Sequence, residues 1–440
     1  MTYSAAGRLA RFSVALLSAS LLLGCATERA LMPTPTIYQG ANADSVFNDV
    51  PSQRKQPAVN LLYITDRARE TDPESDLPYG AGRSGEIAFG SAIVQMGPDL
   101  AWSDLEQQSR LGQRTEPVNL TLGEVTEIGR FPPTPYQVRV TDKGIEYDAG
   151  VLAKHEEAKQ ALTAEFGQRL DASPRKEVVL YVHGFNETFE TAAFSIAELC
   201  HFLGREHVCT LFTWPAGIGG FMLTAYGYDR ESSEFGTFHL KKMIRFLAQL
   251  PKVEKIHLLA HSRGTDVLLS ALRELTIETY SSGRHLSILK LENVVFMAPD
   301  IDSEIASQRI NPISSDPDMF KALSADTLPF EDMGIFTVYT SPADRALFGS
   351  SFLFRSRRVG QFRAEDASPE LIEFWKEIDM LDVIQVPPTR TDSHGHGYFT
   401  TNPVVSSDIV SLIRYGRKPG DPGRALTPVK PPLIWKIEEK

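Results

Sequence analysis

The chain lacks an excess of positive charge, and this excludes one broad class of function. Its 440 residues carry 45 Lys and Arg against 56 Asp and Glu, which gives a formal net charge of -11. Proteins that bind nucleic acid over a wide surface need clustered basic residues. We therefore do not expect nucleic acid as a partner. The composition is that of a globular protein, with 42% hydrophobic and 23% charged residues and no internal repeat.

The chain also lacks, near its start, an apolar run of the length that spans a membrane. The run from Phe12 to Leu23 is too short for a comfortable transmembrane helix. It follows Arg8 and Arg11, as the apolar part of a secretory signal follows a basic part. A short buried helix or an uncleaved anchor is the alternative interpretation.

The end of this run, Leu22-Leu23-Gly24-Cys25, resembles a bacterial lipobox. The resemblance implies that residues 1–24 are a lipoprotein signal peptide and that Cys25 carries the lipid. Ala26 follows the cysteine where aspartate would mark retention, and by resemblance to enterobacterial sorting this favours the outer membrane. We expect a protein held at the periplasmic face of the bacterial cell envelope by its lipid anchor. The polar, proline-bearing residues 25–56 are typical of a tether.

Cysteine is scarce: Cys200 and Cys209 are the only two besides Cys25. They are close in sequence, and an oxidising envelope would permit a disulfide between them. The alternative is two small buried hydrophobic residues. Sequence does not give the separation of their Cα atoms, so both interpretations stay open.

From residue 177 onward, short apolar strands alternate with helical patterns. This alternation predicts an α/β fold with a mostly parallel central sheet and helices on both faces. We expect a single domain over residues 57–415, which includes N-terminal strands, an insertion at 97–170 with a helix at 149–170, and a possible lid at 301–333. We expect an extended C-terminal tail at 416–440. The predicted strands are 59–67, 85–96, 118–129, 136–142, 177–182, 208–214, 255–260, 292–298, 335–340 and 382–386, and the later helices are 187–203, 234–250, 263–275, 369–379 and 404–415.

One serine lies between a predicted strand and a predicted helix, in "IHLLAHSRGTDVLL" (256–269). A nucleophile elbow has this context, and its pattern is G-x-S-x-G. Here the first small residue is Ala260, and Gly264 is the second. Both are small enough for a tight turn, so Ser262 is a candidate nucleophile. The alternative is a serine that caps the following helix.

An oxyanion site and two partners complete the candidate set. His183-Gly184 ends a strand as the oxyanion loop of α/β-hydrolases does, so we expect the N–H groups of Phe185 and Arg263 to be the donors. For the acid we favour Asp344, in the loop after strand 335–340, with Asp300 as the alternative.

The base is expected last in the chain, after the final strand. His394 and His396 are both available there, and we favour His396. Asp392 with the two histidines could instead indicate a metal cluster. The hydrolase interpretation requires no cofactor and no metal. A further interpretation is a structural ion pair of Asp229 with Arg230 or Arg263. Arg263 is the more interesting partner, because neighbouring residues in a chain rarely pair.

The segments "YVHGFN", "FTWPA", "YGYDRESSEFG", "LLAHSRGTDVLL", "APDID", "SPADRAL" and "HGYF" resemble an uncharacterised bacterial family of α/β-hydrolases, esterase- or lipase-like. The resemblance covers residues 59–415 and is strongest from 177 to 400. It implies an α/β-hydrolase fold and supports Ser262, His396 and an aspartate as the triad. The family usually has methionine after the serine, where this chain has Arg263. It implies no particular substrate.

Two functional hypotheses follow. The first is an envelope-tethered serine hydrolase that acts on a carboxylic ester or lipid through an acyl-enzyme on Ser262. The second is a lipoprotein scaffold or binding module whose hydrolase fold is catalytically silent. Reactivity of Ser262 distinguishes them.

Overall fold

The computed structural model describes residues 29–39, 46–310, 318, 334–378, 380–388 and 392–438. The expected signal peptide (1–24) and lipidated Cys25 lie outside the described residues. So does most of the expected lid, of which residues 301–310 and Asp318 are described. Among the described residues, no helix combines the length and apolarity needed to cross a membrane.

The centre of the fold is a sheet of eleven strands in the order β12-β13-β11-β10-β9-β8-β6-β7-β1-β2-β3. In this order every neighbouring pair between β13 and β1 is parallel. The antiparallel pairs are β12–β13 at one edge and β1–β2 and β2–β3 at the other. The mostly parallel sheet is therefore confirmed. Its strands are β1 (Ala58–Arg69), β2 (Tyr79–Met96), β3 (Leu120–Arg130), β6 (Glu177–Val182), β7 (Val208–Thr213), β8 (Lys255–His261), β9 (Leu291–Met297), β10 (Ile335–Thr340), β11 (Leu381–Gln385), β12 (Leu426–Lys430) and β13 (Ile434–Ile437).

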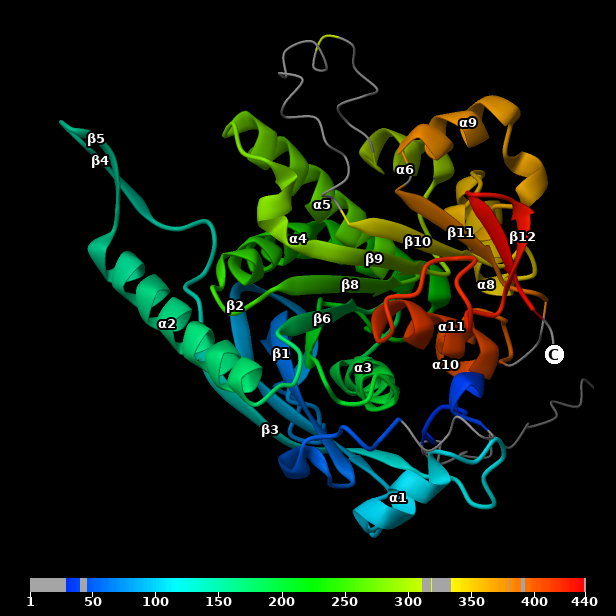
Figure 1. Ribbon diagram of the computed structural model, residues 1–440. Coiled ribbons are helices and arrows are strands. Elements are labelled where there is room, and N and C mark those ends of the chain that lie inside the picture. The colour runs from blue at the N-terminus through cyan, green and yellow to red at the C-terminus, as the bar shows by residue number, and fades with distance from the viewer. Residues whose placement is uncertain are drawn as a thin grey trace, which may run out of the picture.

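Helices cover both faces of the sheet (Figure 1). Alternate residues of each strand face opposite sides, so Val178 and Val179 belong to two separate apolar cores. One core is closed by α3 (Phe189–Phe202), α10 (Tyr398–Thr401) and α11 (Pro403–Ile413). The other is closed by α2 (Ala149–Asp171), α4 (Met222–Gln249) and α5 (Gly264–Ser281). The remaining described helices are α1 (Trp102–Gln108), α6 (Ser303–Ile310), α8 (Arg345–Phe354) and α9 (Pro369–Ile378).

Residues 97–170, expected as an insertion, contribute a sheet strand, a packed helix and a separate hairpin. β3 extends the sheet at its edge, and α2 packs its apolar stripe against the core. β4 (Val138–Thr141) and β5 (Gly144–Tyr147) form a separate hairpin that projects beyond α2 in Figure 1. The insertion is thus joined to the hydrolase sheet.

The two ends of the described chain differ from expectation. Part of the expected tether is packed, since Leu31, Met32 and Phe47 are buried in the core beside α3. The expected extended tail contributes β12 and β13 to the sheet, with Ile434 and Ile437 buried. These two strands were not predicted because residues 416–440 are rich in proline and contain few apolar positions.

Cys200 near the end of α3 and Cys209 in β7 form a disulfide, with their Cα atoms 6.1 Å apart. The bond ties the helix to the strand that follows it. Both cysteines are also buried. The disulfide interpretation and the buried-residue interpretation therefore each describe part of the structure.

Candidate active site

Ser262 lies on the turn between β8, which ends at His261, and α5, which begins at Gly264. Its φ angle is +51°, a left-handed conformation that non-glycine residues rarely adopt. The turn is fixed by main-chain hydrogen bonds: the Ser262 N–H donates to Met297 O, and the Ser262 carbonyl accepts from the N–H of Thr265 and of Asp300. The N-cap of α5 is Arg263, so the helix-cap interpretation of Ser262 does not describe this turn.

Close packing explains the small residues around this turn. A Cβ atom on Gly264 would lie 2.2 Å from His183 O, which is too close for any side chain. A Cβ on Gly184 would lie 2.9 Å from Ser262 Cβ. The loop after β6 and the turn after β8 therefore touch each other at two glycines. Ala260 is fully buried in β8, where its methyl group is accommodated.

The side chains of His396 and Asp344 meet beside this turn. His396 Nδ1 lies 2.6 Å from Asp344 Oδ2 and donates its hydrogen bond there. Asp344 is buried at the start of α8, and its other oxygen accepts from the Leu347 N–H. This contact fixes the His396 tautomer, which leaves Nε2 as the acceptor.

The loop that carries His396 is organised by Asp392. Its carboxylate accepts hydrogen bonds from the N–H groups of His394, Gly395, His396 and Gly397. Burial acts to raise the pKa of Asp392, and these hydrogen bonds overcome it and lower the pKa. The Asp392 oxygens are thus occupied by backbone N–H groups. The alternative interpretation, a metal cluster of Asp392 with the two histidines, is not among the groups of possible metal ligands in the described residues.

The electrostatics of His396 suit a base. Burial acts to lower its pKa, but the hydrogen bond and charge of Asp344, with the charges of Asp300 and Asp392, raise it above 6.5. The imidazolium that forms on accepting a proton is therefore stabilised. His394, the alternative, is exposed and contacts the Ser393 hydroxyl.

Asp300, the alternative acid, makes no hydrogen bond to His396 in the described part of the chain. Its carboxylate accepts from the Tyr226 hydroxyl at 2.6 Å and the Ser350 hydroxyl at 2.7 Å, and Arg358 Nε lies 3.3 Å away. Asp300 does not cap the next helix, because Asp302 accepts from the N–H groups at the start of α6. Asp300 contributes charge near His396 and anchors Tyr226.

His261 connects the serine turn to the histidine loop. Its ring lies 4.8 Å from the His396 ring and 4.7 Å from that of Phe399, and its Nε2 lies 3.3 Å from His396 O. On its other side, Nδ1 lies 3.6 Å from Glu187 Oε1, which also accepts from the Gly184 N–H. These contacts of Glu187 and His261 connect the loop after β6, the serine turn after β8 and the loop that carries His396.

No hydrogen bond joins the Ser262 hydroxyl to another described residue. In hydrolases without substrate, the contact between nucleophile and base is often long and tightens in the complex. The ring of His261, the residue before Ser262, lies 4.8 Å from the His396 ring, so the serine turn and the His396 loop are in contact.

The two expected oxyanion donors are free. In the described residues, neither the Phe185 N–H nor the Arg263 N–H donates to a main-chain or side-chain acceptor. The neighbouring Asn186 N–H is bound instead to Asp229 Oδ2 at 2.8 Å, and Asn186 has a φ of +58°. Asp229 also accepts from the Gly217 N–H at 3.2 Å. It therefore holds the backbone around Phe185 in place.

The expected ion pair between Asp229 and Arg263 is wrong. Arg263 Nη2 pairs with Asp266 at 2.5 Å and also contacts the Ser233 hydroxyl. Asp229 is satisfied by backbone N–H groups, while burial raises its pKa to about 6.

Aromatic rings lie next to one another beside Phe185. The Tyr226 ring lies 5.1 Å from Phe185 and 5.2 Å from Phe354. A cavity of about 550 Å³ lies beside Tyr226 and Phe354; Leu223 and Leu353 line it together with the charged residues Arg230, Glu231 and Glu234. Large apolar side chains are exposed around it at the start of α4 and on α8: Ile218, Phe221, Met222, Leu223, Phe348, Phe352 and Leu353.

Sequence reasoning missed the roles of Glu187, His261, Ser350 and Arg358. His261 could have been noticed because it stands next to Ser262. The other three carry no local signal, since their partners lie far away along the chain.

A family model described as alpha/beta hydrolase of unknown function (DUF900) matches residues 158–414. No protein of curated function matches the chain. Solved structures similar to this chain include an esterase of Pyrobaculum calidifontis, at 13% identity over 56% of this chain and 78% of that one, with a TM-score of 0.28. A lipase-esterase related protein of Clostridium acetobutylicum has 12% identity over 54% and 96%, with a TM-score of 0.26.

A third structure, Est1E of Butyrivibrio proteoclasticus with ferulic acid bound, has 12% identity over 56% of this chain and 94% of that one, with a TM-score of 0.28. Similarity at this level supports no transfer of substrate or mechanism from these proteins.

Proposed function

Because the chain belongs to the family of alpha/beta hydrolases of unknown function, we propose that it is a serine hydrolase that cleaves carboxylic esters. The observation that carries this proposal is the contact of His396 with Asp344 beside the strained turn at Ser262. A base held by a buried carboxylate next to a serine on such a turn is the arrangement that activates a hydroxyl.

The reaction has two halves. Ser262 Oγ attacks the ester carbonyl while His396 Nε2 takes its proton, and the N–H groups of Phe185 and Arg263 bind the oxygen that becomes negative. The tetrahedral intermediate collapses, the C–O bond to the alcohol breaks, and His396 returns the proton to the alcohol. Water then attacks the acyl-enzyme with the same base, which releases the carboxylic acid and restores Ser262.

Leu223, Leu353 and Phe354 offer apolar contacts to an acyl group beside the site, in a cavity that Arg230, Glu231 and Glu234 also line. Tyr226 lines the same cavity, and its ring touches the proposed oxyanion residue Phe185. Burial of each methylene group there contributes about 0.8 kcal/mol. The acyl chain would extend from the carbonyl along Tyr226 and Phe354 into this cavity.

The proposal includes an envelope location, with Cys25 as the lipid carrier. It is supported by the signal pattern of residues 1–25. In cells, the parent chain should fractionate with membranes and Cys25→Ser with the soluble fraction. Equal fractionation of the two would refute the anchor.

Hydrolysis of p-nitrophenyl esters of increasing acyl length tests the enzymatic proposal. We expect activity that Ser262→Ala removes, and a kcat/KM that rises from acetate to longer chains. Leu353→Asp should reduce the rate on long chains more than on acetate. Activity that persists in Ser262→Ala would exclude Ser262 as the nucleophile.

A further inference from the structure

Three side chains with metal-binding atoms converge far from Ser262. Glu177 begins β6, His207 precedes β7, and His257 lies near the start of β8. These strands are neighbours in the order β7-β6-β8 and run parallel. The group therefore lies at the end of the central strands where their chains begin, whereas Ser262 follows the opposite end of β8.

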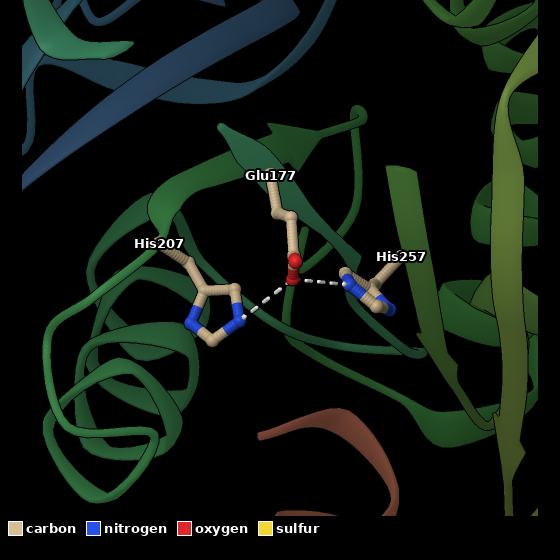
Figure 2. A group of neighbouring side chains, drawn as sticks. All are labelled: Glu177, His207 and His257. Carbon is tan, nitrogen blue, oxygen red and sulfur yellow. Dashed lines mark hydrogen bonds and ion pairs between the residues drawn. The ribbon is translucent and has the colours of Figure 1, made fainter. Parts of the chain in front are cut away.

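The strand register turns all three side chains to one face. Val178 pairs with Val208, which puts Glu177 level with His207, and His257 pairs with Val179. Side chains two residues apart share a face of a strand, so Glu177 and Val179 point the same way. Figure 2 shows both imidazole rings directed at the carboxylate of Glu177.

The distances suit one shared ion. Glu177 Oε2 lies 3.1 Å from His257 Nε2 and 3.4 Å from His207 Nε2, and the ligand atoms all lie within 4.8 Å of one another. Ligands about 2.0–2.1 Å from a tetrahedral zinc ion stand about 3.3–3.4 Å apart. The observed separations are close to these values, and an ion at this point would replace the hydrogen bond between His257 and Glu177.

His207 supplies an independent observation. The residue is buried, with 2% of its surface exposed, and neither ring nitrogen makes a hydrogen bond with another described residue. Burial without a well-formed hydrogen bond is costly for an imidazole, since Nδ1 has no described partner and Nε2 faces only Glu177 Oε2 at 3.4 Å. Its Nε2 is aimed at the same point as that of His257.

The neighbours are arranged to support the ligands. Arg175 Nη1 lies 3.6 Å from Glu177 Oε1, so the other oxygen, Oε2, is the one that faces the histidines. Asn293 Nδ2 lies 2.9 Å from His257 Nδ1, across the β8–β9 pair. With its amide turned over, Asn293 would accept the Nδ1 proton and orient His257, as outer partners of metal-bound histidines do.

We propose that Glu177, His207 and His257 bind a divalent transition metal of the zinc class. Two imidazoles and one carboxylate are a ligand set that Zn²⁺ takes in proteins, with water in the remaining position. The ion would join the starts of three adjacent strands next to the Cys200–Cys209 disulfide. Its role is structural, because the proposed catalytic residues lie at the other end of these strands.

Zinc binding to the full chain with Cys25→Ser tests the site, since that change removes the thiol as a competing ligand. After chelator treatment, Zn²⁺ is titrated in competition with a chromophoric chelator, and Co²⁺ is added separately to record its visible absorption. We expect about one Zn²⁺ per chain and a Co²⁺ spectrum of a four-coordinate nitrogen and oxygen site. Zn²⁺ should also raise the Tm.

Matched variants decide the location. His207→Gln and Glu177→Gln should weaken zinc binding at least about tenfold, in line with the loss of ligand contacts. His155→Gln, on the distant helix α2, should bind like the parent. Circular dichroism checks that each variant is folded. If His207→Gln is unfolded, Glu177→Gln is the deciding variant, because glutamine keeps the shape of the glutamate side chain. A folded parent that binds no zinc, or equal affinity in Glu177→Gln and the parent, would overturn the proposal.

Discussion

His396 Nδ1 lies 2.6 Å from Asp344 Oδ2, although the two residues follow different strands and stand 52 positions apart. Asp344 is fully buried at the head of α8, while His396 is carried by a loop bound to Asp392. Two separately fixed supports therefore determine where the imidazole sits. A base positioned in this way needs little reorganisation before reaction.

The first prediction separates the two candidate acids. Asp344→Asn should reduce kcat by about 10³–10⁴-fold, because an amide at this position favours the wrong imidazole tautomer. Asp300→Asn should reduce it by no more than about tenfold, since Asp300 bonds to Tyr226 and Ser350 rather than to His396. Steady-state kinetics on one ester, with melting curves to check folding, measures both. The reverse ranking would make Asp300 the acid.

The second prediction concerns pH. The carboxylate of Asp344 raises the pKa of His396 above 6.5, and only neutral His396 can accept a proton. The acid limb of kcat/KM should therefore lie above pH 6.5. Removing the negative charge in Asp344→Asn destabilises the imidazolium, so the limb of the residual activity should move to lower pH. An unmoved limb would mean that another group controls it.

The third prediction uses a matched pair of glycines. In Gly184→Ala, the new methyl group would lie 2.9 Å from Ser262 Cβ, so the turn or the oxyanion loop must shift. Such a displacement should cost about 100-fold in kcat.

Gly167→Ala is the control, because a Cβ there meets nothing within 4 Å in the interior of α2. It should keep full activity and stabilise the fold by about 0.5–1 kcal/mol. If Gly184→Ala were as active as Gly167→Ala, the contact between the two loops would have no part in catalysis.

The fourth prediction tests the support of the oxyanion loop. Asp229→Ala removes the acceptor for the N–H groups of Asn186 and Gly217. The Phe185 N–H should then be poorly placed, and kcat should fall about tenfold or more while KM changes less. Measuring kcat and KM separately with a short-chain ester checks this expectation. A rise in KM alone would indicate a role in substrate binding instead.

Much of the central fold could be predicted because its strands are continuous apolar runs separated by helical patterns. β6 and β10 begin and end where the sequence predicts. β12 and β13 were not predicted, since five or fewer residues at a sheet edge bury too few apolar side chains to give a pattern. The start of α4 was also missed, because residues 222–233 are largely polar or exposed.

The candidate site could be predicted where chain order and strand ends determine position. Ser262, Asp344 and His396 follow strands whose ends share one edge of the sheet, and the structure brings Asp344 and His396 together there. The support of the site could not be predicted. Tyr226 and Asp300 are 74 residues apart, and only the packed structure shows that they share a hydrogen bond.

The most direct test of the central claim is reaction of the purified protein with a fluorophosphonate, followed by peptide mass mapping. We predict one modified residue, Ser262, with labelling lost in His396→Ala and strongly slowed in Asp344→Asn. This result would establish an activated nucleophile at the turn between β8 and α5. A folded protein that hydrolyses no ester and takes no label at Ser262 would contradict the account and favour a binding role for the same fold.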